Sequence, residues 1–163
     1  ILINCAAINY VNPHDKITVS EWNKVIQVNL TSVFLICNAV LSYMKKIKYG
    51  KIINVSSIAG RHRSIISGIH YVSSKAALIG YTRQLAYEVA KYNINVNAVC
   101  PSQTKTKMYR NTMTNKKEKE LIKTIPLKRI ANINEQIEPI VFLCTDSASY
   151  ITGSIVDING GQL

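Results

Sequence analysis

Short apolar runs alternate with long amphipathic stretches along this chain, and the alternation constrains its fold more than any other feature. Residues 51–56 form the clearest run. They are near-continuously apolar and rich in β-branched side chains, as expected for a strand covered by helices on both faces. Further strands are expected at residues 1–3, 94–99 and 154–158. Strands that alternate with helices form parallel sheets, so this order predicts an α/β fold.

Helices are expected between these strands, at residues 22–44, 71–91 and 132–143. Two capping boxes mark helix starts. Thr18 pairs with Glu21 before the first helix, and Asn132 pairs with Glu135 before the last. Residues 102–125 are polar and rich in lysine, which is typical of a long connection that lies over a functional site.

Composition limits the classes of function. The length of 163 residues and the hydrophobic content of 47% fit one domain, residues 1–163. Twenty Lys and Arg against nine Asp and Glu leave a net charge of +11, but the basic residues are scattered and do not alternate with aromatic ones. Nucleic-acid binding is therefore not predicted. Polar residues such as Lys24 and Asn29 interrupt the longest apolar stretch, so no membrane span is predicted either.

Cysteine and histidine placement points to a cytoplasmic protein without a catalytic metal. The four cysteines are widely spaced, without a Cys-x-x-Cys pair, and are interpreted as reduced core residues. None of the three histidines, His14, His62 and His70, clusters with cysteines or carboxylates at metal-ligand spacing. The sequence opens without Met, directly in a strand-like apolar triplet, which favours further residues upstream.

Tyr71 and Lys75 form the strongest local signal for chemistry. They are four residues apart on a predicted helix, so their side chains lie on the same face. An adjacent ammonium would lower the pKa of the tyrosine and allow it to act as a general acid or base. The pair alone is common in helices, but a strand that ends in Ser56 and Ser57 precedes it. Either hydroxyl would then face Tyr71 where open α/β sheets bind their ligands.

A series of motifs in order resembles the short-chain dehydrogenase/reductase family, most closely its 3-oxoacyl-(acyl-carrier-protein) reductase-type members. The similarity covers the whole chain and includes residues 4–7, Asn29, Ser57, Tyr71 with Lys75, residues 101–106, residues 150–153 and residues 159–161. The resemblance implies the C-terminal portion of a Rossmann-type, doubly wound parallel sheet in three α/β/α layers. In this family a βαβ unit with a Gly-rich, pyrophosphate-binding turn comes first, and this sequence does not contain it.

The resemblance also implies roles for individual residues. Tyr71 would be the acid/base, Ser57 would orient the substrate, and Lys75 would tune Tyr71 and bind the nicotinamide ribose. Asn29 would hold a water linked to Lys75. Ser56 is the alternative to Ser57. The implied cofactor-binding residues are Asn4, Ala6, Ala7, Tyr71, Lys75, Pro101, Thr104 and Thr106, with Thr106 favoured over Thr104 for the carboxamide or phosphate contact.

Two positions depart from the family pattern, because Ala7 and Ser102 stand where glycine is usual. A Cβ at either position restricts close backbone approach to a cofactor. The residues that distinguish NAD from NADP lie upstream, so either cofactor fits. In the loop after Ser57, Arg61 and its neighbours His62 and Arg63 either meet an anionic substrate or form a solvated surface.

The expected function is hydride transfer between NAD(P) and a carbonyl or alcohol, with a carrier-bound 3-oxoacyl thioester as the first choice of substrate. Family resemblance also implies a homo-oligomer, a dimer or tetramer, with no nucleic-acid or membrane partner. The alternative is a truncated or degenerate relative that keeps the fold and acts as a binding or scaffold protein.

Overall fold

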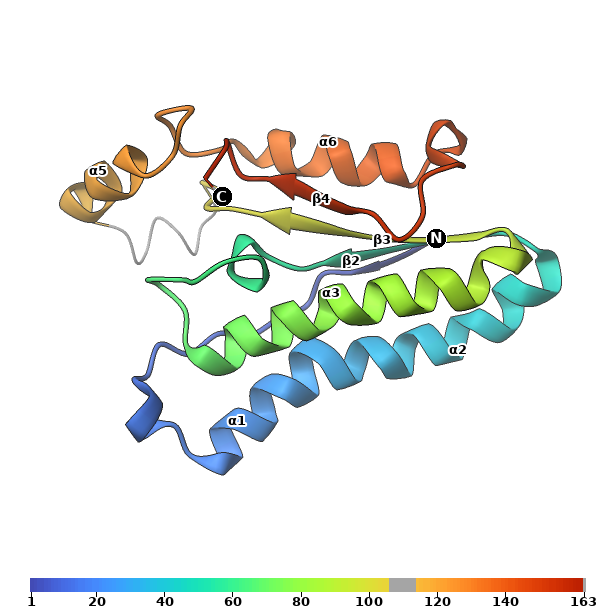
Figure 1. The fold of residues 1–163 in the computed structure, drawn as a ribbon, viewed down its shortest axis with the longest axis horizontal. Coiled ribbons are helices and arrows are strands. Elements are labelled where there is room, and N and C mark those ends of the chain that lie inside the picture. Colours follow the sequence, from blue (N-terminus) through green and yellow to red (C-terminus); the bar gives the residue numbers. More distant parts are fainter. Residues whose placement is uncertain (106–113, 163) are drawn as a thin grey trace.

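A parallel four-stranded sheet forms the centre of the protein. The computed structural model describes residues 1–105 and 114–162, and Figure 1 shows its layers. The strands are β1 (Leu2–Asn4), β2 (Gly50–Val55), β3 (Ile94–Pro101) and β4 (Ile155–Ile158), and their spatial order is β1-β2-β3-β4. All three strand pairs are parallel, which confirms the α/β prediction.

Helices cover both faces of the sheet. Helices α1 (Val19–Ile26), α2 (Ser32–Ile47) and α3 (Ile69–Val89) lie on one face, and α6 (Ile133–Leu143) lies on the other (Figure 1). A further helix, α5 (Asn115–Lys123), lies beyond the carboxyl ends of the strands. Short 3-10 turns occur at His14–Lys16 (η1), Ile58–Gly60 (η3), Ala90–Tyr92 (η4) and Asp146–Ala148 (η5). The three-layer, Rossmann-type architecture is therefore confirmed.

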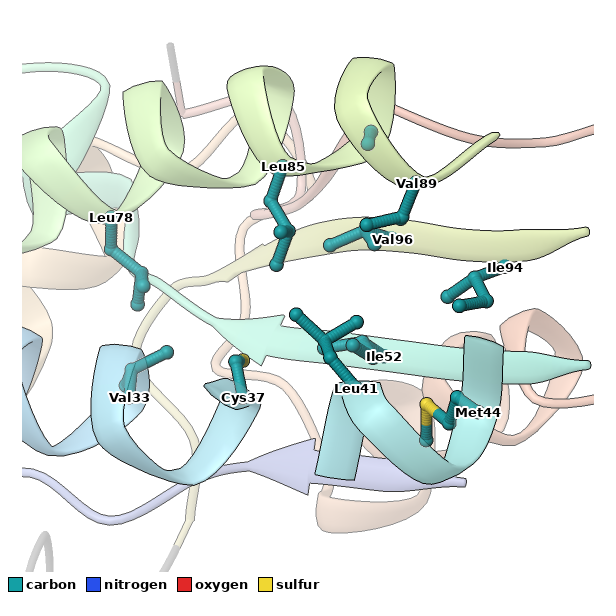
Figure 2. Packing of buried hydrophobic residues seen from close by; sticks show 11 residues of the cluster. Val33, Cys37, Leu41, Met44, Ile52, Leu78, Leu85, Val89, Ile94 and Val96 are labelled. Carbon is teal, nitrogen blue, oxygen red and sulfur yellow. The ribbon is translucent and has the colours of Figure 1, made fainter. Parts of the chain in front are cut away.

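The larger core lies between α2, α3 and the sheet. Figure 2 shows side chains of α2 and α3 meeting the strand residues Ile52, Ile94 and Val96. The helix contributions are Val33, Cys37, Leu41 and Met44 from α2 and Leu78, Leu85 and Val89 from α3, all less than 9% exposed. A smaller cluster on the opposite face joins Ile53 and Val99 to Leu143 of α6. Burial on both faces agrees with the apolar side chains that β2 and β3 present to both helix layers.

The first predicted helix differs from expectation, because a π-helical segment, η2 (Gln27–Thr31), separates α1 from α2. Asn29 lies inside this segment and is 1% exposed. Its amide accepts a hydrogen bond from the backbone N–H of Ile8 (2.8 Å) and donates one to the carbonyl of the same residue (2.9 Å). Insertions of this kind are frequent at functional sites. The strand-to-helix contact through Ile8 anchors the segment to the chain that follows β1.

Of the two predicted capping boxes, the one that begins α6 is confirmed. The Glu135 carboxylate accepts from the backbone N–H of Asn132 (2.8 Å), and the Asn132 side chain caps in return. The first is only half formed. Thr18 accepts from the backbone N–H of Glu21 (3.1 Å), but the carboxylate of Glu21 binds residues outside α1. Long-range partners therefore replace the local one.

One continuous helical stretch, Val19–Ile47, has the length and apolar content of a membrane-crossing helix, and 28% of its most apolar window is buried. A single stretch of this kind is weak evidence, because the core helices of many water-soluble proteins share both properties. Four of its side chains, those of α2 in Figure 2, lie in the larger core. The absence of a membrane span remains a prediction from the sequence.

Strand β1 forms an edge of the sheet as far as the structure describes it, since it pairs only with β2. Two apolar side chains next to this edge are open to solvent: Ile1 is 69% exposed and Ile3 is 45% exposed. Apolar edges with free backbone groups favour pairing with another strand.

Candidate active site

The predicted site residues gather where the parallel strands end. Ser57 follows the carboxyl end of β2, Ala6 and Ala7 follow β1, and Pro101 is the last residue of β3. Tyr71 lies in the first turn of α3, which packs against η3 just after β2. Open α/β sheets bind ligands outside the carboxyl ends of their strands. The fold thus brings residues from four separate segments to that edge.

Lys75 lies beside Tyr71 and is held by the end of β2. Its Nζ is 5.7 Å from the centre of the Tyr71 ring and donates a hydrogen bond to the carbonyl of Val55 (2.7 Å). The residue is 2% exposed. Burial lowers the pKa of Lys75 to about 8, so the ammonium is charged at neutral pH and loses its proton in mild alkali.

The pKa of Tyr71 moves in the direction opposite to the sequence prediction. Burial raises it above the ordinary tyrosine value, and a hydrogen bond with the Ser57 hydroxyl acts against this rise. Lys75 was expected to lower it, but that ammonium is committed to the Val55 carbonyl. Tyr71 is therefore a protonated phenol at neutral pH, in contact with the Ser57 hydroxyl.

The two serines after β2 do different things. Ser56 is 3% exposed and its hydroxyl donates to the Lys75 carbonyl (2.8 Å), which ties β2 to α3. Ser57 is half-buried, and its oxygen accepts the backbone N–H of Ala59 (3.1 Å) at the start of η3. Because a hydroxyl that accepts one hydrogen bond still has its own proton, Ser57 retains a donor for a partner oxygen. This geometry favours Ser57 over Ser56 as the substrate-orienting hydroxyl.

Gly60 allows the Ser57 turn to lie directly on α3. A Cβ at this position would stand 2.6 Å from the carbonyl carbon of Lys75 and 2.7 Å from its oxygen. Backbone atoms cannot be moved aside like a flexible side chain, so only glycine permits this approach. Gly60 therefore sets the distance between the turn that carries Ser57 and the helix that carries Tyr71.

Replacing Gly60 tests this contact. Gly60→Ala should lower the free energy of unfolding by about 1–3 kcal/mol, the usual range for overpacking, and should also lower any turnover. The matched control is Gly80→Ala on α3, where a Cβ meets no atom within 4 Å. That change should stabilise the protein by up to about 1 kcal/mol, because alanine is the better helix former. Urea unfolding of both variants checks the pair; equal stabilities would disprove the close-packing argument.

Asn29 connects η2 to the helix that carries Tyr71. Besides its two bonds to Ile8, its amide donates to the Ser74 hydroxyl (3.1 Å), which in turn donates to the Tyr71 carbonyl (2.8 Å). Three hydrogen bonds thus tie the Asn29 side chain to protein atoms. Its observed role is to position the segment after β1 and the first turn of α3.

Residues 1–162 match a family model described as enoyl-(acyl carrier protein) reductase. The chain belongs to the short-chain dehydrogenase/reductase family. It is 40% identical over 162 residues to a 3-oxoacyl-(acyl-carrier-protein) reductase of Buchnera aphidicola, covering 99% of this chain and 66% of the relative. It is 37% identical to the acetoacetyl-CoA reductase of Shinella zoogloeoides, covering 99% and 67%.

A solved 3-oxoacyl-(acyl-carrier protein) reductase of Brucella melitensis with bound NAD superposes with a TM-score of 0.89 at 32% identity. The alignment covers 99% of this chain and 61% of that one. The chain therefore spans about two thirds of the length of the family members that it matches.

The predicted cofactor-binding residues differ in their exposure to solvent. Ala6 and Ala7 are exposed after β1, and Pro101 and Thr104 are half-buried at and after the end of β3. Asn4 points inward instead: it is 8% exposed, and its amide donates to the Asn54 side chain (2.8 Å). Its observed contacts thus hold β1 to β2 below the edge. Thr106 lies outside the described residues.

Sequence reasoning missed three side chains that shape the family's site in this chain. Asp157 on β4 binds Arg61 (2.9 Å), which anchors the turn after Ser57 and neutralises the charge proposed for an anionic substrate. Glu21 and His70 form a second pair (2.8 Å) beside Tyr71. Arg61 and Asp157 are 96 residues apart in the sequence, and Glu21 and His70 are 49 apart, so local spacing could not reveal either pair. The one signal in the sequence was the position of His70 next to Tyr71. Across the described residues, no group of three metal-ligating side chains converges.

Proposed function

We propose that the intact protein is an NAD(P)-dependent oxidoreductase that reduces a carbonyl to an alcohol, with a 3-oxoacyl thioester as its substrate. The observation that carries the proposal is the convergence of Tyr71, Ser57 and Lys75 at the carboxyl edge of the sheet. The names of the Buchnera and Shinella relatives support the thioester substrate, on either an acyl carrier protein or coenzyme A.

The residues at this edge fit a nicotinamide cofactor. Lys75 uses one ammonium proton on the Val55 carbonyl, which leaves two protons for the hydroxyls of a ribose. The exposed backbone of Ala6 and Ala7 and the Pro101–Thr104 segment border the same edge. The bound nicotinamide would supply the hydride in reduction. The NAD in the Brucella relative supports this assignment, and NAD and NADP remain equal candidates.

In the proposed reaction Tyr71 donates the proton that the substrate oxygen needs as it becomes an alcohol. The raised pKa of Tyr71 keeps the phenol protonated at neutral pH, which suits a general acid and therefore the reduction direction. The Ser57 hydroxyl donates a hydrogen bond to the same oxygen and orients it. Two donors that converge on an oxygen stabilise the negative charge that develops there.

Lys75 supports both tasks. Its ammonium fixes the end of β2 relative to Tyr71 and places a positive charge 5.7 Å from the ring, which stabilises the phenolate left after proton donation. Asn29 and Ser74 hold the Tyr71 carbonyl from the other side. In the full reaction cycle Lys75 would also bind the ribose.

We expect the rate of reduction to fall as the pH rises through about 8. Burial lowers the pKa of Lys75 to about 8, so the ammonium loses its proton and its charge in this range. Lys75→Met should lower kcat/KM by about tenfold or more, the loss of one charge-assisted hydrogen bond, and should lack this alkaline limb. Lys51→Met is the matched control, since Lys51 is also 2% exposed but binds Asn95 at the opposite end of β2. An unchanged profile in Lys75→Met would exclude this role.

The direct test is an assay of the purified intact protein with acetoacetyl-CoA and either NADH or NADPH, followed by loss of the reduced cofactor's absorbance. Steady turnover with one cofactor supports the proposal. The alternative is a binding or scaffold protein that has kept the family fold, and it predicts cofactor or thioester binding without turnover by calorimetry. Turnover of sugars or polyols in place of thioesters would keep the reaction class and change the substrate.

We also propose that the protein forms a homo-oligomer in the cytoplasm. Two helices carry exposed apolar side chains: Phe34, Leu35 and Tyr43 on α2, and Ile137, Val141 and Phe142 on α6. Such faces support self-association. All four cysteines are free, which is consistent with a reducing compartment.

A further inference from the structure

The first turn of α3 lacks an ordinary N-terminal cap. Its N-cap residue, Gly68, has no side chain to accept the backbone N–H of Tyr71. A Cβ at Gly68 would stand 2.4 Å from the Tyr10 carbonyl oxygen and 2.5 Å from the His70 ring, so a capping side chain cannot be accommodated. The Gly68 N–H donates to that same Tyr10 oxygen (2.9 Å). Close packing on the segment after β1 thus removes the usual cap.

His70 takes over this task. Its Nδ1 accepts the backbone N–H of Tyr71 (2.9 Å), and its ring is completely buried. Because a backbone N–H can only donate, Nδ1 carries no proton and the single ring proton lies on Nε2. Nε2 donates to the Glu21 carboxylate (2.8 Å), so the contacts on the two ring nitrogens fix one tautomer.

Glu21 brings a carboxylate from α1 to the start of α3. It is held by the Asn12 amide, which lies 3.0 and 2.9 Å from its two oxygens. Hydrogen bonds from His70 and Asn12 lower the pKa of Glu21, so it is ionised at neutral pH. Since it lies in the first turn of α1 and beside the first turn of α3, one negative charge meets the positive ends of two helix dipoles.

We propose that Glu21 and His70 form a positioning pair for Tyr71. This inference rests on the proposed catalytic role of Tyr71. The backbone of Tyr71 is held at both ends: His70 accepts its N–H, and Ser74 donates to its carbonyl. The side chain between these two contacts is the phenol that must meet the substrate oxygen.

A proton on Nδ1 replaces the acceptor with a donor that faces the Tyr71 N–H. The two N–H groups cannot bond to each other, so the first turn of α3 loses its only cap. Two groups face His70: the Glu21 carboxylate from α1 and the Tyr10 ring from the segment after β1. The Tyr10 ring is edge-on to the His70 ring, with 6.2 Å between the ring centres. The Lys24 ammonium lies over the Tyr10 ring, 5.9 Å from its centre. The cap on Tyr71 therefore depends on the ring tautomer that the Glu21 contact fixes.

Two substitutions separate the two contacts of the ring. His70→Asn places an amide oxygen where Nδ1 stands, so it can accept the Tyr71 N–H but loses the Glu21 contact. His70→Gln places an amide nitrogen where Nε2 stands, so it keeps the Glu21 contact and loses the acceptor. In the intact protein we expect Gln to lower kcat by about five- to tenfold, the loss of one hydrogen bond, with little change in KM. Asn should recover most of kcat.

The control is His62→Asn, since His62 is exposed on the loop after η3 and its replacement should leave kcat unchanged. Full activity in His70→Gln combined with low activity in His70→Asn would overturn the proposal. A readout independent of turnover is the nitrogen NMR spectrum of the His70 ring, which must show the proton on Nε2 at neutral pH. A proton on Nδ1 would refute the pair even in an active enzyme, whereas absence of turnover with the Nε2 form would refute only the proposed function.

Discussion

Tyr71→Phe should lower kcat by at least about 10²-fold while the fold stays intact, because the change removes only the hydroxyl that we propose as the proton donor. The side chain is partly exposed at the carboxyl edge of the sheet, and its hydroxyl has no structural contact except that with Ser57 among the described residues. Phenylalanine keeps the ring beside the Lys75 ammonium. The measurement is steady-state kinetics of the intact protein with acetoacetyl-CoA, with unfolding curves to show that stability is retained.

Tyr87→Phe is the matched control for this experiment. Tyr87 lies on the same helix, α3, but is 83% exposed and far along it from the sheet edge. Its loss of a hydroxyl should leave kcat unchanged. Activity of Tyr71→Phe close to that of the parent protein would show that Tyr71 is not the general acid.

The pKa directions of Tyr71 and Lys75 are consistent with the proposed reduction. A general base must lose its proton near neutral pH, but burial raises the pKa of Tyr71 and burial lowers that of Lys75. Both shifts disfavour the phenolate, since one acts on the phenol itself and the other weakens the cation that would stabilise the anion. A buried phenol with an intact proton is suited to donate it to a developing alkoxide.

Local patterns predicted the parts of the fold that depend on local physics. The apolar β-branched run at residues 51–56 matches β2 to within one residue, and the Asn132–Glu135 capping box begins α6 as expected. Both depend on neighbours in the sequence or on burial between two helix layers. The same holds for Tyr71 and Lys75, whose proximity follows from helical spacing.

The features that sequence reasoning missed depend on contacts between distant segments. The π-helical segment around Asn29 coincides with bonds to Ile8, 21 residues away, and no local propensity announces it. The Glu21 carboxylate does not complete the capping box with Thr18, because it bonds to His70, 49 residues further along the chain. The direction of the Tyr71 pKa was wrong for a similar reason: spacing gave the distance to Lys75 but not its burial or its bond to Val55.

Ser57→Ala should lower kcat about as much as Tyr71→Phe, by about 10²-fold, because it removes a hydrogen-bond donor aimed at the substrate oxygen. The neighbouring Ser56→Ala provides the comparison, with the same atom deleted one residue earlier. Its hydroxyl donates to the Lys75 carbonyl inside the protein, so its loss should lower the free energy of unfolding by about 1 kcal/mol and leave kcat within a few-fold.

The two variants should therefore have opposite effects on turnover and on stability. Ser57→Ala loses turnover but little stability, since its hydroxyl bonds to the backbone only through the N–H of Ala59 among the described residues. Ser56→Ala loses stability but little turnover. Kinetics and urea unfolding on the same preparations measure both quantities. If Ser56→Ala is instead the slow enzyme, the orienting hydroxyl belongs to Ser56, and the turn held on α3 by Gly60 serves the fold rather than the substrate.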